Sequence, residues 1–252
     1  MGEALLGGVL STGWATPEEV RVVELAAARQ DELRAAYPGL SASADVDPSV
    51  DTLVSVKPQH VADVLANLGS SSVRVLSVAA GVRIADMEAA APQARVIRAM
   101  PNTPSLVGMG ASAISGGRLV EAVDLEWAES ILGAVGTVER VEEADLDAVT
   151  GLSGSGPAYI FHFAEGLIAA GIAQGLSPEI ADRLARQTIL GAATLLSSSG
   201  EDPAILRQNV TSPGGTTAAG LAVFADSDLV GLVGNVVAAA TERSLELGEG
   251  SD

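Results

Sequence analysis

The feature that most constrains how this 252-residue chain can fold is a change of pattern near residue 142. Up to that point, short runs rich in valine, leucine and isoleucine alternate with charged, Ala- and Leu-rich segments of helical periodicity. The runs are 20–25, 53–56, 73–78 and 95–100, and the helical segments are 26–37, 61–68, 82–91 and 123–132. Strands that alternate with helices predict βαβ units and a mostly parallel sheet covered by helices on both faces.

From residue 143 onward the strand pattern disappears. Ser177-Pro178-Glu179 combines an N-cap, a proline at the first helical position and an acid in the first turn, and helices are also predicted over 157–174 and from about 228 to 247. These helices carry apolar or small residues on most sides, which requires burial against more than one neighbour. We therefore predict an α/β domain over residues 1–142 and an all-helical domain over residues 143–252 that packs against a second copy of the chain.

The counts of certain side chains exclude several kinds of site. The chain has no cysteine, so thiolate zinc sites, iron–sulfur clusters and cysteine nucleophiles are ruled out. Its two histidines, His60 and His162, are far apart in the sequence, so we predict neither a metal site nor a Ser-His-Asp triad. The net charge of −18 disfavours nucleic acid as a partner. The sequence has no apolar run of about 18 to 20 residues and no secretory signal pattern, so we expect a cytoplasmic protein without a membrane partner.

Lys57 is the only lysine in the chain. It follows the predicted strand 53–56 and precedes Pro58, which places it at the carboxyl end of a parallel strand, where open α/β sheets bind ligands. The next strand ends in the small residues of segment 77–81, and the one after it ends in Met-Pro-Asn-Thr-Pro, residues 100–104. We interpret these strand ends as parts of one ligand site, although each alone is also ordinary turn chemistry.

Two glycine-rich segments precede predicted helices. Segment 152–157, Leu-Ser-Gly-Ser-Gly-Pro, matches neither a nucleophile elbow nor a Walker loop, and we interpret it as a flexible, close-packed entry to a helix. Segment 209–217, Asn-Val-Thr-Ser-Pro-Gly-Gly-Thr-Thr, gathers hydroxyl groups and free backbone N–H groups at a helix N-terminus. Such a terminus binds anions, here a substrate carboxylate, although the segment also fits a plain loop.

The first ten residues read as a helix that directly precedes a strand. A dinucleotide-binding unit has a strand, a Gly-x-Gly-x-x-Gly turn and then a helix whose N-terminus faces the pyrophosphate. Of that turn, only its last glycine, as Gly2, is represented in this sequence.

With these segments together, the sequence resembles pyrroline-5-carboxylate reductase, the last enzyme of proline biosynthesis. The resemblance covers nearly the whole chain. Its most specific parts are Val56-Lys57-Pro58, the runs 97–104, 150–159 and 210–217, and the closing helix with Asn235, Arg243 and Glu246. It implies a Rossmann-like domain, its first strand missing, followed by a helical domain that interlocks with its twin as a homodimer or a higher oligomer.

The resemblance also implies the site residues, the reaction and the cofactor. The cofactor would be bound by Gly2, Val56, Lys57, Pro58, Ala79, Ala80, Gly81, Asn102 and Thr103. The substrate would be bound by Ser212, Gly214, Gly215, Thr216 and Thr217, with Thr217 as the catalytic hydroxyl nearest the ring nitrogen. The implied reaction is hydride transfer from NADPH, with NADH possible, to the C=N carbon of 1-pyrroline-5-carboxylate, which gives L-proline. The expected partners are this small substrate and a second copy of the chain.

The sequence departs from the family pattern at its start, where the family has a strand and a glycine turn ending in Gly-Asn-Met-Gly. About ten residues of that pattern are missing, and their loss would leave neighbouring strands with exposed edges. A misplaced start codon is our hypothesis, and an in-frame stop codon directly upstream in the DNA would refute it. Two alternatives stay open: another imine or hydroxyacid reductase of the same two-domain build, and a truncated, non-catalytic paralogue.

The choice between the two nicotinamide cofactors is also open. Glu24 lies at the end of the predicted strand 20–25, where an acid favours the free 2′-hydroxyl of NAD and repels the phosphate of NADP. Arg29 follows closely and would offset that repulsion.

Overall fold

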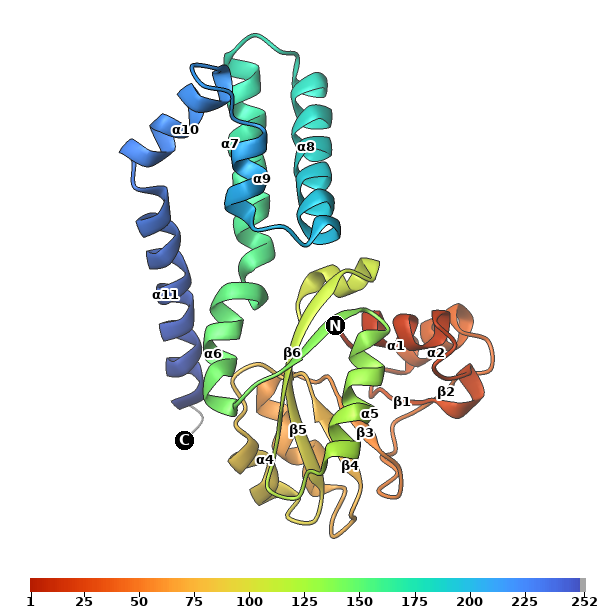
Figure 1. Ribbon diagram of the computed structural model, residues 1–252. Helices are drawn as coiled ribbons and strands as arrows, with labels where there is room; N and C mark the ends of the chain where they lie inside the picture. The colour runs from red at the N-terminus through yellow and green to blue at the C-terminus, as the bar shows by residue number, and fades with distance from the viewer. Residues whose placement is uncertain (250–252) are drawn as a thin grey trace. The chain divides into compact units, whose positions relative to one another are not determined.

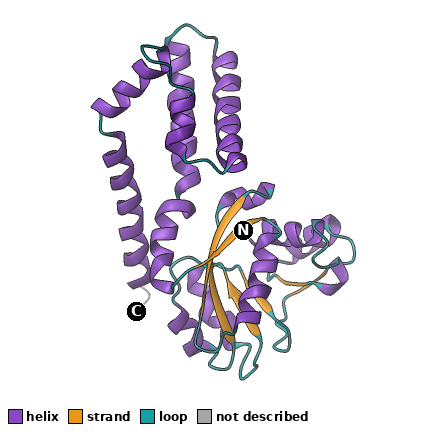
Figure 2. Cartoon of the chain, in the orientation of Figure 1, coloured by secondary structure: helices purple, strands orange, loops and turns teal. Residues whose placement is uncertain are grey.

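The computed structural model describes residues 1–249, and the chain folds into two compact units. The first unit comprises Met1–Ser155 together with the chain from Ala238 onward, and the second comprises Gly156–Val237. The domain boundary predicted from the sequence, between residues 142 and 143, stays a prediction. Figure 2 shows that all strands belong to the first unit, whereas the second is built from helices.

The first unit contains a two-stranded sheet and a five-stranded sheet (Figure 1). The small sheet pairs β1 (Arg21–Val23) with β2 (Ser41–Ser43) in parallel. The large sheet has the order β3 (Thr52–Val54), β4 (Arg74–Ser77), β5 (Arg95–Met100), β6 (Gly110–Gly116) and β7 (Gly136–Arg140). Only the pairing of β5 with β6 is antiparallel, so the predicted, mostly parallel α/β architecture is confirmed.

The helices and turns of this unit alternate with its strands. The α-helices are α1 (Gly2–Ser11), α2 (Ala27–Ala36), α3 (Val61–Ala66), α4 (Ile84–Ala90), α5 (Ala122–Gly133) and α6 (Leu146–Val149). The short 3-10 turns are η1 (Pro17–Glu19), η2 (Pro58–His60), η3 (Thr103–Val107) and η4 (Glu143–Asp145), and a π-helical turn, η5 (Thr150–Gly154), follows α6.

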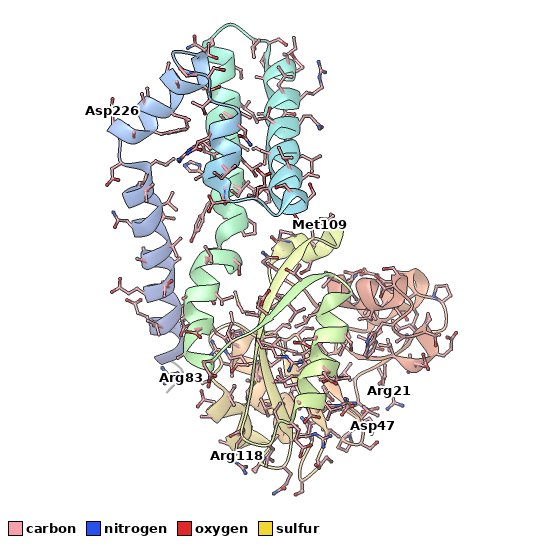
Figure 3. The ribbon with its side chains drawn as sticks, viewed as in Figure 1. Arg21, Asp47, Arg83, Met109, Arg118 and Asp226 are labelled. Carbon is pink, nitrogen blue, oxygen red and sulfur yellow. The ribbon has the colours of Figure 1, made fainter. Side chains whose placement is uncertain are left out.

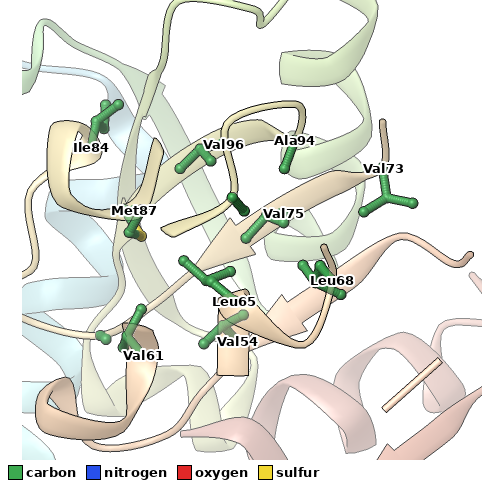
Figure 4. Close-up of a cluster of buried hydrophobic side chains, with 12 residues drawn as sticks. Val54, Val61, Leu65, Leu68, Val73, Val75, Ile84, Met87, Ala94 and Val96 are labelled. Carbon is green, nitrogen blue, oxygen red and sulfur yellow. The ribbon is translucent and has the colours of Figure 1, made fainter. Parts of the chain in front are cut away.

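Successive residues of the central strands point to opposite faces of the large sheet, and both faces are covered. Val75 and Val96 contribute to a cluster with α3 and α4 (Figure 4), whereas their neighbours Leu76 and Ile97 contribute to a second cluster with α1 and α5. All four side chains have no exposed surface. This alternation explains why the strands read as continuous apolar runs in the sequence.

The sheet is interrupted between β1 and β3. Among the described strands, β1 pairs only with β2, and β3 pairs on one side with β4. Each therefore has an edge without a strand partner, as the resemblance led us to expect.

Three strands were missed by the sequence analysis. Strands β2 and β6 consist almost entirely of Gly, Ala and Ser, which do not give a β-branched pattern. Strand β7 carries charged residues at the edge of the sheet. The four predicted strands and the predicted helices of this unit are present, with boundaries shifted by at most two residues.

The second unit contains α7 (Gly156–Ala173), α8 (Pro178–Ser199), α9 (Pro203–Asn209), α10 (Thr216–Asp226) and the first part of α11 (Leu229–Glu249). The predicted cap of α8 is confirmed, since the hydroxyl of Ser177 accepts a hydrogen bond from the N–H of Ile180 at 3.4 Å. Helix α7 packs closely on α8, because a Cβ atom added to Gly171 would lie 3.2 Å from the Cβ of Ala181. Helix α9 was not predicted.

The second unit buries little of its apolar surface. Within Gly156–Val237, only Ala181 and Ala185 are buried, whereas Phe161 is 64% exposed and Val230 is 84% exposed. Apolar surface on this scale requires another apolar surface to cover it. This agrees with the expectation that the helices pack against a second copy of the chain.

Candidate active site

A cavity of about 350 Å³ lies in the first unit, where loops that follow parallel strands meet the end of α11. Three of the predicted cofactor-binding residues, Pro58, Ala80 and Gly81, line it. The rest of its wall consists of Thr150, Ser155, Ala240, Arg243, Ser244 and Leu247. Two of the three strand ends that were grouped from the sequence thus contribute to this hollow, whereas no residue of 100–104 lines it.

The loop after β3 carries the Val-Lys-Pro segment. Val56, Lys57 and Pro58 are all exposed, and Pro58 begins the turn η2. A proline at this point suits the first residue of a helical turn, since its missing N–H has no partner to lose there. Val56 and Lys57 do not line the cavity but lie immediately before the residue that does.

The loop after β4 turns sharply at Gly81. Its φ of +75° is in the left-handed region, which glycine adopts without the steric cost of a side chain. Ala79 is 5% exposed and belongs to the core, whereas Ala80 is exposed and faces the cavity. The methyl group of Ala80 and the absence of a side chain at Gly81 therefore let a flat ligand approach the backbone.

Asn102, after β5, is 9% exposed and its side-chain amide is used inside the protein. Its Nδ2 donates to the carbonyl of Ser153 at 3.0 Å, and its Oδ1 accepts from the N–H of Ala111 at 2.9 Å. The amide thus joins the end of β5 to β6 and to the π-helical turn η5. Thr103, the next residue, begins η3 and is exposed.

Gly2 begins α1 and lies against the loop after β3. A Cβ atom at Gly2 would lie 2.2 Å from the Oγ of Ser55, so a larger residue here would force the Ser55 side chain to move. The start of α1 is therefore beside the Val-Lys-Pro segment, at the carboxyl ends of the strands. No side chain caps this N-terminus.

The predicted substrate-binding residues lie together in the second unit. Pro213 and Gly214 form a turn in which the N–H of Gly215 donates to the carbonyl of Ser212 at 3.0 Å, and Gly214 has a φ of +69°. Gly215 is the N-cap of α10, with no side-chain cap. The side chains of Ser212, Thr216 and Thr217 are at least partly exposed beside the uncapped helix start.

The polar residues of the cavity wall were not among the site residues predicted from the sequence. Thr150 precedes the glycine-rich segment 152–157 and Ser155 belongs to it, so their hydroxyl groups were visible in the sequence. The segment continues the helix as a π-helical turn, closed by a hydrogen bond of 2.8 Å from the N–H of Ser155 to the carbonyl of Thr150. It is close-packed as predicted, since a Cβ atom at Gly154 would lie 2.5 Å from Met100 Cε.

The end of α11 supplies the other polar groups. Ser244 is 7% exposed and donates from its hydroxyl to the Asp147 carboxylate at 2.6 Å, which attaches α11 to α6. Arg243 lines the cavity, and its exposed guanidinium pairs with Glu246 at 2.6 Å. These residues are about 160 positions from Gly81 in the sequence, so no local pattern could have grouped them.

The residues of this hollow fit one end of a dinucleotide. Its volume is in the range of small-molecule sites, and it combines small, apolar surfaces with hydroxyl groups and one guanidinium.

Among residues 1–249, no group of three or more His, Asp or Glu side chains is arranged to hold a metal ion. No described helix is by itself long and apolar enough to cross a membrane, and only the bent pair α10 and α11 meets the length and composition requirement when taken together.

Comparisons with known proteins agree with these features. Residues 143–247 match the family model described as pyrroline-5-carboxylate reductase dimerisation. Pyrroline-5-carboxylate reductase from Synechocystis sp. is 42% identical over 99% of this chain and 95% of its own length. The structure of a pyrroline-5-carboxylate reductase from Coxiella burnetii superposes with a TM-score of 0.91 at 33% identity, over 98% of this chain and 94% of that one.

A further solved structure is that of Plasmodium falciparum pyrroline carboxylate reductase with NADP bound, with a TM-score of 0.83 and 29% identity over 98% of this chain and 94% of that chain. The likeness therefore extends over both units and is carried by sequence and by fold. This chain belongs to the pyrroline-5-carboxylate reductase family.

Proposed function

We propose that this protein reduces 1-pyrroline-5-carboxylate to L-proline with NAD(P)H as the hydride donor. The observation that carries the proposal is the cavity at the strand ends, lined by Pro58, Ala80 and Gly81, in a chain similar over 99% of its length to a curated reductase of this name. When bound, the reduced nicotinamide supplies a hydride to the C=N carbon of the substrate.

The first unit binds and orients the cofactor. Lys57 and Pro58 flank the nicotinamide end, and the small residues Ala80 and Gly81 let it lie against the backbone. Asn102 acts through its backbone partners, since both ends of its amide are already hydrogen-bonded. Fixed loops of this kind hold the reacting carbons within the roughly 3 to 3.5 Å that hydride transfer requires.

The second unit binds the substrate. The start of α10 presents backbone N–H groups without a side-chain cap, and this positive end of the helix accepts the substrate carboxylate. Thr217, in the first turn, holds its hydroxyl at the ring nitrogen and positions the proton that this nitrogen takes up. Because an imine nitrogen is readily protonated, the site needs no histidine and no pair of carboxylates.

The protein acts as a dimer through its helical unit. The apolar side chains that the second unit exposes, such as Phe161 and Val230, then become buried between two copies. The match of residues 143–247 to the dimerisation family model supports this arrangement.

The test is a steady-state assay of NADH and NADPH oxidation with and without 1-pyrroline-5-carboxylate, with L-proline measured as the product. Imine-dependent oxidation with a matching yield of proline is expected. If a 2-keto acid supports oxidation of the cofactor instead, another reductase of the same build is favoured. If no substrate supports oxidation, the non-catalytic paralogue is favoured.

The role of Thr217 is tested in the same assay. Thr217→Ala should lower kcat by about ten- to a hundredfold, which corresponds to the loss of one positioned hydrogen bond of about 1.4 to 2.7 kcal/mol. Thr194→Ala is the matched control, because this exposed threonine of α8 donates only to the carbonyl of Leu190. Equal kinetics of the two variants would remove Thr217 from the mechanism.

A further inference from the structure

Helices α1 and α2 are neighbours in the first unit (Figure 1), and an ion pair joins their first turns at one edge of it. Glu3 in the first turn of α1 pairs with Arg29 in the first turn of α2, with 2.5 Å between carboxylate and guanidinium. Gly2, next to Glu3, lies against Ser55 after β3. The loop between β1 and α2 is therefore at the same edge as the Val-Lys-Pro loop, which belongs to the proposed cofactor site.

Glu24 is the first residue of that loop. Its N–H continues the ladder of β1 with a 2.9 Å hydrogen bond to the carbonyl of Ser43, so its position at the carboxyl end of the strand is fixed. Its Oε1 accepts from the N–H of Ala26 at 2.9 Å, while its Oε2 has no partner within the described chain. In dinucleotide-binding units, an acid about 20 residues beyond the glycine turn accepts a hydrogen bond from the adenosine ribose.

The cations near this carboxylate are already paired with acids. The guanidinium of Arg29 contacts Glu32 at 2.6 Å and Glu3 at 2.5 Å. The hydrogen bond from Arg29 to Glu32 and the charge of Glu3 raise the pKa of Arg29 above its ordinary value, so these two acids stabilise the charged guanidinium. It therefore offers little free positive charge to a phosphate.

The remaining arginines of β1 and α2 are engaged as well. Arg34 pairs with Asp31 at 2.8 Å and also donates to the carbonyl of Ala42. Arg21, at the amino end of β1, pairs with Asp47 at 3.1 Å (Figure 3). The residue directly after Glu24 is Leu25, which is 83% exposed and carries no charge.

We infer that Glu24 makes this protein prefer NADH over NADPH. This inference rests on the proposed function and sharpens it, since the family resemblance alone implies NADPH. The free carboxylate oxygen accepts a hydrogen bond from the 2′-hydroxyl of NADH, whereas the 2′-phosphate of NADPH brings its negative charge toward Glu24, Glu3 and Glu32, and Arg29 is already paired with two of these acids. We therefore expect kcat/KM to favour NADH by about ten- to a hundredfold, the effect of one hydrogen bond to a charged group.

The experiment compares binding and turnover. The affinities of the purified full-length protein for NAD⁺ and NADP⁺ are measured by calorimetry, and kcat/KM is measured for NADH and NADPH with 1-pyrroline-5-carboxylate. The variants are Glu24→Ser, which removes the acid, and Glu24→Gln, which keeps its size and removes its charge. Glu126→Gln is the matched control, since this acid of α5 acts through its charge on Arg140 of β7.

The wild type and the control should bind NAD⁺ more tightly than NADP⁺, and both variants at position 24 should reduce that ratio at least tenfold. An equal or reversed preference in the wild type, or an unchanged ratio in Glu24→Ser and Glu24→Gln, would overturn the inference. Binding separates this result from the proposed function, since a preference for NAD⁺ without imine reduction would support the role of Glu24 and refute the reaction.

Discussion

The buried amide of Asn102 gives the most specific prediction about how the cavity is built. Replacing Asn102 with alanine removes two hydrogen bonds and leaves the carbonyl of Ser153 and the N–H of Ala111 without a partner. An unpaired, buried backbone group costs about 1 to 3 kcal/mol, and both groups here belong to half-buried residues, which favours the lower part of that range. Asn102→Ala should therefore lower the free energy of unfolding by about 2 to 4 kcal/mol.

The assay is urea denaturation followed by circular dichroism, at one fixed protein concentration because association stabilises the folded state. The matched control is Asn67→Ala, since Asn67 is exposed and donates only to the carbonyl of Asp63, in its own helix. The control should change stability by about 0.5 kcal/mol or less. Similar losses in both variants would refute the structural role of Asn102. Asn102→Ala should also weaken cofactor binding, because its amide secures the turn η5 beside the cavity.

Two further predictions concern stability. Gly136→Ala should destabilise the fold by about 3 kcal/mol or more, since the new Cβ would lie 2.0 Å from the backbone of strand β6. Gly133→Ala should be tolerated, since a Cβ atom there would have no neighbouring atom within 4 Å. Comparing the urea midpoints of the two variants checks this prediction. Burial raises the pKa of Asp51, but hydrogen bonds from the guanidinium and N–H of Arg74 outweigh burial and leave that pKa below its ordinary value. The stability from this pair is thus complete above the ordinary carboxyl pKa and is lost as the pH falls through the lower, folded value, so the difference in urea midpoint between wild type and Asp51→Asn should shrink below about pH 4.

The helices and strands that were predicted from the sequence are those whose own residues show a clear strand pattern or a helix cap. Strand β5 was predicted to the residue because Val96 and Ile97 are buried on opposite faces and both are β-branched. Helix α8 was predicted from the cap at Ser177. The same kind of signal, Asp202 followed by Pro203, precedes α9, so that helix was within reach of the sequence.

Other features depend on contacts that no local pattern encodes. Strand β6 is built from small residues and is placed by its neighbours β5 and β7, not by its own β propensity. The far wall of the cavity comes from Arg243 and Ser244, which reach it only because α11 is attached to α6 through Asp147. The pairing of Arg29 with two acids, which decides its availability to a phosphate, likewise emerges only when α1 and α2 are brought together.

We propose above that this protein transfers a hydride from a reduced nicotinamide to the imine carbon of 1-pyrroline-5-carboxylate. The most direct measurement uses NADH carrying deuterium at the transferable position of the nicotinamide and follows the product by mass spectrometry. We expect L-proline with a single deuterium on the ring carbon that belonged to the C=N bond. Proline without the label, or no proline while the protein is folded and binds the nucleotide, would contradict it.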